Sequence, residues 1–293
     1  KLSIKPGIAY RTAVYDDTKY SDTIQKAGIF NAKGHIVSKT ASIRADYNLF
    51  HSKLRLIGGI TLNEFNYPDT MYPSYQLAAT YRVNKENLVR AVYSQAPRSS
   101  NVFDTYIDQT LAYFPSGFRS FTRMALQGNK NLALLTTNMI ELGYRSKISS
   151  KMNIDIELFD ITGKHFSALV ENKSYRETRG SDTLTIVPLV PTNLPLILKQ
   201  LGVTVSVNYT SKQIQVKPFI TLQQTKMKNY APYGVTPDTG EPLHIYSNMG
   251  GKEIIKSTPA VFGGASVNYV PDSKWNFNLN AYYYSSQTYS HLS

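Results

Sequence analysis

Few residues of this sequence have the types and spacing that catalysis or metal binding requires. The five histidines, at positions 35, 51, 165, 244 and 291, are isolated, and no two have the spacing of metal ligands. The chain has no cysteine, which excludes disulfides, thiolate metal sites and cysteine nucleophiles. We therefore expect histidines that are solvated or lie in loops, and no metal site.

One carboxylate pair and one glycine-rich segment could still indicate chemistry. Asp155 and Glu157 are two residues apart, so a β-strand would place both carboxylates on one face, as an acid–base pair requires. A row of polar side chains along one face of a sheet explains the pair without catalysis. The segment 250–252 lacks the leading glycine of a phosphate-binding loop, and no nucleophile elbow is present. The sequence therefore predicts a protein that is not an enzyme.

Aromatic and basic residues gather in two long stretches that lack a regular period. Such a mixture suits a chelate, a glycan or a peptide as ligand, since rings stack and cations pair with oxygens. Packing of the loops against one another explains the same residues, and both interpretations stay open. The candidate ligand contacts are Phe114, Phe118, Arg119 and Arg123 in the first stretch and Tyr230, Tyr233 and Tyr246 in the second, with Tyr113 and His244 beside them.

The elements that must position these residues have the two-residue period of half-buried β-strands. In residues 203–209, three valines and Tyr209 alternate with Thr204, Ser206 and Asn208. Comparable segments are 41–48, 54–63, 75–82, 140–145, 153–158 and 275–283. No segment has the roughly 20 mostly apolar residues of a transmembrane helix. We predict an all-β chain.

The connections between these predicted strands alternate in length. We expect short polar turns near 49–53, 84–87, 146–151, 210–213 and 271–274, and long irregular stretches at 16–33, 66–73, 96–137, 180–200 and 228–257. Outer-membrane barrels alternate short periplasmic turns with long extracellular loops in this way. Lys85 is therefore expected at the periplasmic end and Tyr233 at the extracellular end.

The tyrosines support a membrane location. The chain has 22 of them and only 18% charged residues, whereas soluble domains have about a quarter charged residues. Five tyrosines each end a predicted strand just before a short turn, in phase with its apolar face: Tyr47, Tyr81, Tyr144, Tyr209 and Tyr269. Outer-membrane barrels carry outward-facing aromatic rings at both interfaces. We predict an antiparallel transmembrane β-barrel, with a soluble β-rich carbohydrate-binding protein as the weaker alternative.

The formal net charge of +12 narrows the choice of partners. Nucleic acid is one partner that such a charge suggests. However, the basic residues, such as Arg44, Arg90 and Arg145, are scattered singly and form no block. Outer-membrane lipid and lipopolysaccharide, or an anionic ligand in the lumen, explain them at least as well. We expect no nucleic-acid partner.

Several short motifs resemble those of TonB-dependent outer-membrane receptors. Residues 91–98, with Tyr93, Ala96 and Pro97, resemble the aromatic-x-x-Ala-Pro box that precedes a long loop in these receptors. Residues 128–132 followed by 140–145 resemble their Asn-Pro-x-Leu box leading into Glu-x-Gly-Tyr-Arg. Residues 153–159 are similar to the strand that comes next in the family, and residues 258–269 resemble the family's late strands. Lys130 stands where the family has proline, and Ala133-Leu134-Leu135 stands where it has Lys-Pro-Glu.

The resemblance implies that residues 1–293 form the β-barrel portion of such a receptor, about a dozen of roughly 22 strands. The family's plug domain and energy-coupling segment have no counterpart here, and the chain ends at His291-Leu292-Ser293 without a terminal aromatic residue. Both features are typical of an internal fragment. No histidine lies between residues 95 and 132, where haem importers of the family carry one, so haem is disfavoured.

The resemblance also implies a function. We expect a receptor in the outer membrane of a Gram-negative bacterium that takes up a chelate, glycan or peptide, with energy from a TonB-type protein acting through the missing N-terminal region. A surface lipoprotein is a further expected partner, and no cofactor is expected. The alternative is a surface binding or scaffold barrel that transports nothing. A plug domain with a coupling segment upstream would decide for transport.

Overall fold

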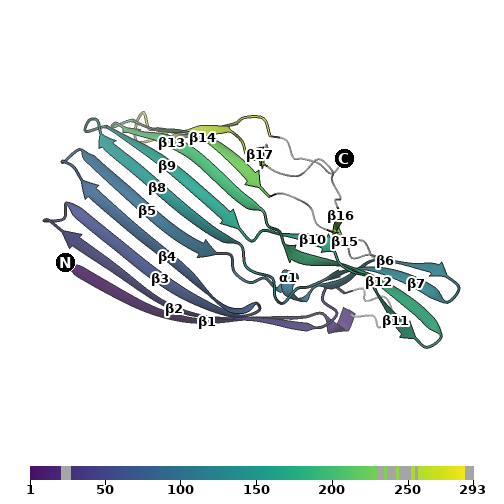
Figure 1. The fold of residues 1–293 in the computed structure, drawn as a ribbon. Helices are drawn as coiled ribbons and strands as arrows, with labels where there is room; N and C mark the ends of the chain where they lie inside the picture. The colour runs from purple at the N-terminus through teal and green to yellow at the C-terminus, as the bar shows by residue number, and fades with distance from the viewer. Residues whose placement is uncertain (21–27, 230–233, 236–241, 244–251, 255–256, 288–293) are drawn as a thin grey trace.

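The computed structural model describes residues 1–20, 28–229, 234–235, 242–243, 252–254 and 257–287, which lie mainly in two β-sheets (Figure 1). The larger is a 12-stranded sheet that we call the strand wall. Neighbouring strands of the wall are antiparallel and follow one another along the chain, apart from the segments that leave it. Its strands are β1 (Leu2–Asp16), β2 (Lys33–Leu49), β3 (Leu54–Asn66), β4 (Asp69–Arg82), β5 (Asn87–Pro97), β8 (Thr136–Lys147), β9 (Met152–Lys164), β13 (Ile197–Thr210), β14 (Ile214–Lys228), β17 (Lys252–Ile254), β18 (Val261–Tyr269) and β19 (Phe277–Tyr284).

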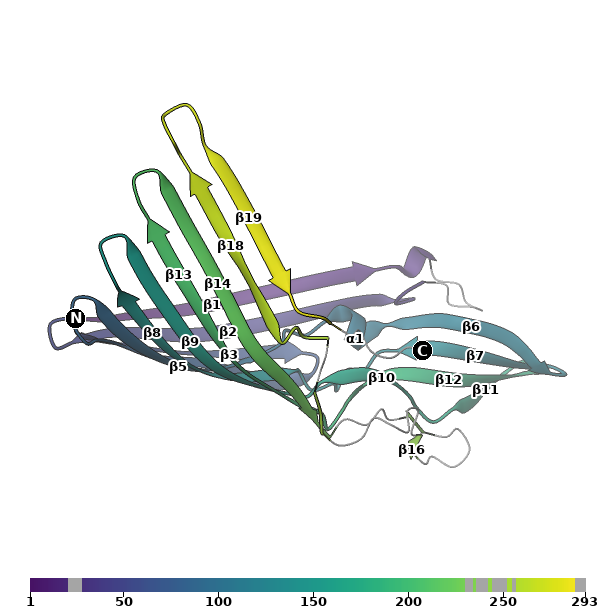
Figure 2. The same cartoon turned by 90° about the horizontal axis from the view of Figure 1, so that it is seen from above.

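The second sheet has five strands and is called the distal sheet here. It consists of β6 (Asp108–Gly117), β7 (Ser120–Gln127), β10 (Ser167–Glu171), β11 (Tyr175–Arg179) and β12 (Asp182–Asn193). The connection from β5 to β8 contributes β6 and β7, and the connection from β9 to β13 contributes the other three. The two connections join through a parallel pairing of β7 with β12. The distal sheet projects beyond one end of the wall (Figures 1 and 2).

The remaining described elements are short. They are the helix α1 (Val102–Tyr106), the 3-10 turn η1 (Thr18–Tyr20) and the strand pair β15 (Gly234–Val235) and β16 (Pro242–Leu243). No helix among the described residues is long and apolar enough to cross a membrane.

Five short turns of the wall lie at its other end, which we call the turn end, and the short β3–β4 turn lies at the opposite end. The connections from β2 to β3, β4 to β5, β8 to β9, β13 to β14 and β18 to β19 agree with the turns predicted from the sequence. Of the predicted long stretches, that at 66–73 is wrong, because β3 ends at Asn66 and β4 begins at Asp69. The chain here alternates polar and aromatic residues on paired strands, which the turn-forming Pro68 obscured.

The stretches 96–137 and 180–200 are long, as predicted, but they are not irregular. They contain α1, β6, β7 and the whole of β12. Prolines at 188, 191 and 195 concealed β12. Pro188 lies between two pairings of β12. Residues of β12 up to Ile186 pair with β11, and residues from Leu189 onward pair with β10. A proline is tolerated in a strand at a place where no partner requires its missing N–H.

The alternation predicted for the wall strands is confirmed. Leu142, Leu158 and Leu201 project from the outer face with exposed fractions of 53%, 52% and 64%. Charged side chains from neighbouring positions, such as Glu141 and Glu157, lie on the inner face. Successive side chains of a strand point to opposite faces, so one apolar and one polar face follow directly from the sequence. The strand directions turn steadily from β1 to β19 (Figure 2), as in a partial barrel.

The buried apolar side chains lie chiefly in the distal sheet and in the segments that connect it to the wall, rather than in the wall itself. Ile107, Ala125, Leu184 and Ile186 are between 0% and 2% exposed. A smaller cluster of Val170, Leu194 and Leu196 lies where β10 and the start of β13 meet. The distal sheet thus has a core of its own.

Candidate functional site

The inner face of the wall is hollowed at the loop end, opposite the short turns. A groove of about 330 Å³ lies over β1 to β4, and Pro97 and Ser99, at the exit from β5, close one side of it. Its lining is mostly hydroxyl and amide groups with one guanidinium: Arg11, Ser38, Thr40, Thr61, Asn63 and Ser74. We call this the rim groove. It suits a ligand rich in oxygen atoms that accept and donate hydrogen bonds.

Hydrogen bonds hold the floor of the rim groove in place. Thr40 donates from Oγ1 to Asn63 Oδ1 at 3.1 Å, and Asn63 donates from Nδ2 to Ser74 Oγ at 3.3 Å. Phe65, 6% exposed, packs its ring against Tyr72 with centroids 6.2 Å apart. The groove therefore has a polar row joined across three strands, with an aromatic pair at its upper edge.

Charged pairs occupy the inner face nearer the turn end. Arg90 donates from Nε to Glu141 at 2.9 Å and from Nη2 to Glu157. Arg145 donates from Nε to Asp155 Oδ2 at 2.7 Å. These are the charges that the sequence placed on the face opposite the apolar one. Glu141 and Asp155 each pair with an arginine of an adjacent strand, and Glu157 pairs with Arg90 across β8. Asp155 and Glu157 are therefore neutralised by different arginines rather than arranged as an acid–base pair.

Three of the predicted ligand contacts lie together on the β6–β7 hairpin. Phe118 at its turn is 94% exposed, and the guanidinium carbon of Arg119 lies 5.6 Å from the centre of the Phe118 ring. Phe114 on β6 is 44% exposed. Tyr113 stacks on Phe121 at 5.5 Å instead and so supports the hairpin. The hairpin presents an aromatic and basic tip at the far end of the distal sheet.

Arg123 differs from its predicted neighbours because it is enclosed in the distal sheet. It is 1% exposed, and it donates from Nε to Thr110 Oγ1 and from Nη2 to Asp108 Oδ1, both at 2.8 Å. Because Arg123 lies on β7 and both of these acceptors lie on β6, it holds the two strands of the hairpin together. The predicted contacts Tyr230, Tyr233 and Tyr246, with His244, lie outside the described residues.

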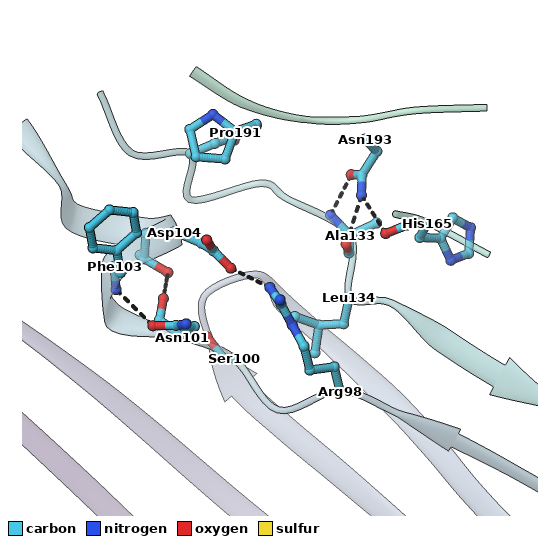
Figure 3. A network of polar contacts seen from close by, with 12 residues as sticks. Arg98, Ser100, Asn101, Phe103, Asp104, Ala133, Leu134, His165, Pro191 and Asn193 are labelled. Carbon is cyan, nitrogen blue, oxygen red and sulfur yellow. Dashed lines mark hydrogen bonds and ion pairs between the residues drawn. The ribbon is translucent and has the colours of Figure 1, made fainter. Parts of the chain in front are cut away.

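A polar network ties the distal sheet to the wall (Figure 3). Asn193, at the end of β12, accepts from the Ala133 N–H at 2.8 Å and donates to the carbonyls of Ala133 at 2.9 Å and His165 at 3.2 Å. Asn129 donates to the Pro191 carbonyl at 3.0 Å. The amide side chains thus join the segment leading into β8 with the end of β12 and with the chain just after β9.

Polar contacts also order the start of the β5–β8 connection. Arg98 pairs with Asp104 of α1, and Asn101 caps this helix by accepting from the Phe103 N–H at 2.9 Å (Figure 3). A side-chain acceptor at this position satisfies an N–H that has no partner within the helix. Short polar residues therefore fix the path of the chain from the edge of the rim groove to β6.

Lys130, which stands where the family has proline, lies between two aromatic rings where the distal sheet meets the wall. Its ammonium lies 5.0 Å from the ring centre of Tyr67 and 5.4 Å from that of Tyr106. Tyr106 donates from its hydroxyl to the His35 carbonyl at 3.0 Å, and burial raises the pKa of its phenol. Lys130 is exposed, and at an exposed site a cation beside aromatic rings contributes about 0.5–1 kcal/mol. Lys130 thus helps to join the β3–β4 turn with the base of the distal sheet.

The sequence interpretation missed the rim groove. Asn63 lies at the end of a predicted strand segment, whereas Arg11 and Thr40 lie outside the predicted segments, and no local signal distinguished the three from inner-face residues elsewhere. Their distance from the short turns was the available signal. Polar inward positions near the long connections are those that a ligand entering from that end meets first. Among the described residues, no three histidine, aspartate or glutamate side chains are grouped as metal ligands.

An outwardly apolar, inwardly polar antiparallel wall is the arrangement of a transmembrane β-barrel, here present in part. The family model for the TonB dependent receptor-like β-barrel matches residues 3–292. The chain therefore belongs to this family, as the motifs predicted. No curated protein sequence matches the chain.

Solved structures with the same fold are siderophore receptors by name. The siderophore receptor PirA from Acinetobacter baumannii has 14% sequence identity and a TM-score of 0.64, over 98% of this chain and 41% of that chain. PirA from Pseudomonas aeruginosa has 12% identity and a TM-score of 0.60, over 97% and 45%. A variant of the ferric enterobactin receptor PfeA from Pseudomonas aeruginosa, bound to enterobactin, has 12% identity and a TM-score of 0.54, over 96% and 46%. The chain spans less than half the length of these receptors.

Proposed function

We propose that this chain is the barrel portion of an outer-membrane receptor that binds an extracellular ligand at the loop end and passes it inward. The observation that carries the proposal is the rim groove, a polar hollow on the inner face of a wall whose outer face is apolar. An outer face of exposed leucines is stable in lipid, whereas a hydrogen-bonded polar groove suits a water-filled lumen. The groove opens beside the distal sheet, where a ligand from outside would arrive.

The location and energy source follow from the family. Its members are outer-membrane proteins of Gram-negative bacteria. The paired charges on the inner face and the tyrosines near the short turns support the same location for this chain. We propose that a TonB-type protein supplies energy through a region of the full protein that this chain does not contain. A plug domain is proposed to belong to that region, and a surface lipoprotein is proposed as a further partner.

Among a chelate, a glycan and a peptide, we favour a ferric chelate. The similar structures are named as siderophore or ferric enterobactin receptors, and this supports the choice at the level of ligand class. The chemistry of the groove supports it as well. Arg11 brings a fixed positive charge to a lining of hydroxyl and amide groups, which suits a compact anionic ligand bearing many oxygens.

We propose that Phe114, Phe118 and Arg119 make the first contact and that the rim groove makes the second. Tyr230, Tyr233 and Tyr246 remain proposed contacts. Arg123 acts by holding β6 against β7, because its Nε and Nη2 donors are already used within the sheet. A ligand would thus pass from an aromatic tip to a polar groove.

Binding by the full-length receptor tests this proposal. Ferric chelates that quench tryptophan fluorescence would be titrated against wild type, Arg11→Ala and Phe118→Ala/Arg119→Ala. Loss of the single cation in the groove should weaken binding by roughly 10- to 150-fold, since a charge-assisted hydrogen bond contributes roughly 1.5–3 kcal/mol. Arg176→Ala, which changes an exposed arginine on β11, is the matched control. Unchanged affinity in both variants would exclude these contacts.

Orientation is tested separately by labelling whole cells. Because the chain has no cysteine, a cysteine introduced at Phe118 or Lys85 is unique within it. Cysteine at the exposed hairpin tip should react with an impermeant maleimide, and cysteine at Lys85 in a short turn should react only after the cells are opened. The reverse result would invert the proposed orientation.

The second candidate is a surface binding barrel without transport. The observation that favours it is the 94% exposed Phe118 at the tip of a projecting hairpin, a typical anchor for another protein. Uptake of labelled chelate by cells with and without the energy-coupling protein distinguishes the two. Binding that persists with no energy-dependent uptake would support the second candidate.

A further inference from the structure

Four lysines lie close together at the loop end of the wall, on its outer face. They are Lys164 on β9, Lys199 on β13 and Lys226 and Lys228 on β14. Lys199 is directly opposite Lys226 in the pairing of β13 with β14. Residues two apart on a strand share a face, so Lys199 is on the same face as Leu201, and Lys226 and Lys228 are on the same face as Leu222. Leu201 and Leu222 are outward and 64% and 47% exposed.

Two like charges directly opposite each other on antiparallel strands are destabilising, since their Cβ atoms are only about 4.5–5.5 Å apart. Lys199 and Lys226 are both exposed. In the part of the chain that the structure describes, no ion pair links any of the four lysines to a carboxylate. The acidic residue nearest in register is Asp160, opposite Leu201 on the same outer face. It forms no ion pair with Lys199.

The rim of β2 and β3 provides a contrast. Lys39, also on the outer face near the loop end, lies opposite Glu64, and their side chains pair at 2.9 Å. There the wall neutralises its own charge. At β13 and β14 the wall places a second lysine where β3 has the glutamate, so no described residue of the chain neutralises this cluster, and an anion from outside can.

The height of the cluster fits the outer membrane interface. Lys199 is ten positions from Tyr209 along β13, which runs from Ile197 to Thr210. Ten residues extend about 33 Å, and a strand tilt of about 40° reduces this to about 25 Å along the membrane normal. An apolar band of about 25 Å is what outer-membrane barrels present between their interfaces. With Tyr209 at one interface, the lysines lie at the other.

The surface below the lysines is apolar. Leu201, Val203 and Val205 descend β13 on the outer face toward Tyr209, and Ile220 and Leu222 face outward on the neighbouring β14. A partner that covers both surfaces must carry phosphate or carboxylate groups above and hydrocarbon below. A lipid with an anionic headgroup has this form, and a soluble anion does not.

We propose that Lys164, Lys199, Lys226 and Lys228 bind the phosphate groups of a bisphosphorylated glycolipid of the outer leaflet. The cluster spans three neighbouring strands, about 10 Å at about 4.8 Å per strand, and so accommodates more than one phosphate. This inference depends on the outer-membrane placement proposed above. It adds a site on the outer face that is separate from the rim groove, with lipopolysaccharide as the source of the headgroup.

The test measures lipid binding by the full-length receptor in detergent. Bisphosphorylated lipid A would be titrated against wild type, Lys199→Gln, Lys226→Gln and the double variant, with bound lipid counted by native mass spectrometry. Each lysine near an anionic surface should contribute about fivefold in affinity. The double variant should therefore bind about 25-fold more weakly. Lys39→Gln, with its own carboxylate partner, should stay within about twofold of wild type.

Further arms identify the ligand chemistry. Lipid A with both phosphates removed should bind no better to wild type than to the double variant. Phosphatidylglycerol, with a single phosphate, should bind more weakly than lipid A, and inorganic phosphate at millimolar concentration should not compete. Equal binding of lipid A by wild type and double variant, or equal binding of phosphatidylglycerol and lipid A, would overturn the proposal.

The result is separable from the proposed transport function. The double variant should keep wild-type affinity for the ferric chelate, because the rim groove is on the opposite face of the wall. If the receptor failed to fractionate with the outer membrane, the transport proposal would fail first. Correct fractionation with unchanged lipid A binding in the double variant would remove only the lysine site.

Discussion

The strand wall and the distal sheet are both antiparallel for the most part, but they are stabilised in opposite ways. On the wall, the large apolar side chains are the exposed ones, with Leu77 and Leu158 at 58% and 52%. In the distal sheet they are enclosed, with Leu184 and Ile186 at 2% and 1%. The arginines differ as well, since Arg145 on the wall has a 57% exposed side chain and Arg123 in the distal sheet a 2% exposed one.

The difference follows from the solvent on each side. A wall strand transfers its apolar face to lipid and leaves its polar face to an aqueous lumen, so it needs no packed interior. The distal sheet projects beyond the wall into water and must bury apolar surface against itself, as soluble domains do. One chain thus uses two rules for the same secondary structure. The changes below test that contrast, in order of decreasing expected effect.

The largest loss is expected from Arg123→Ala. It removes the cation of a mostly buried pair and leaves Asp108 and Thr110 without this donor. Breaking such a pair should cost about 3–4 kcal/mol. Hydrogen exchange of the β7 and β12 amides should accelerate while the urea unfolding of the wall stays unchanged. Arg176→Ala, on an exposed face of β11, should have no such effect. Equal loss in the wall would mean that the two sheets unfold as one unit.

Val205→Lys tests the lipid side of the wall. Lysine near the middle of the apolar band should lower the free energy of barrel unfolding by about 2–4 kcal/mol, and at Tyr209, near the interface, by about 0–1 kcal/mol, because the side chain can extend to water. Ser206→Lys, on the inner face, should change it little. Equal, large losses at Val205 and Tyr209 would contradict a membrane-facing strand, since a soluble core has no such gradient.

Asn193→Ala tests the joint between the two sheets. It removes three hydrogen bonds to Ala133 and His165 and leaves backbone groups unpaired. A loss of about 2 kcal/mol in docking of the distal sheet is expected. Limited proteolysis should then cut the connection near residue 133 sooner. Asn172→Ala, whose side chain only accepts from the adjacent Lys173 N–H, is the control. No change in cleavage would show that other contacts dock the sheet.

The smallest effect is expected from Glu64→Gln. The Lys39–Glu64 pair is well exposed, with side chains 60% and 46% accessible, and exposed pairs contribute little. Unfolding of the wall in urea should stay within experimental scatter. A clear loss of stability would show that this pair lies in a less polar environment than the interface placement predicts.

The strands of the wall could be predicted because their signal is local. In residues 203–209 the period of two assigns each side chain to a face, and Tyr209 before a short turn indicates the interface. Contact of one face with lipid and of the other with water sets this pattern at each residue, independently of which strands are neighbours. Phe118 and Arg119 were predicted as ligand contacts in a long irregular stretch, and the structure instead places them, exposed, at the tip of a hairpin.

Pairing between distant segments could not be read from the sequence. The parallel contact of β7 with β12 joins residues about 60 positions apart, and the prolines of β12 resemble those of a loop. Arg123 has the same residue type as Arg119, yet Asp108 and Thr110 enclose it only once β6 and β7 have paired. The opposition of Lys199 and Lys226 depends on register in the same way. Local periodicity therefore determined the faces of the strands, and the tertiary structure decided which residues meet, because the free energy of a contact depends on both partners.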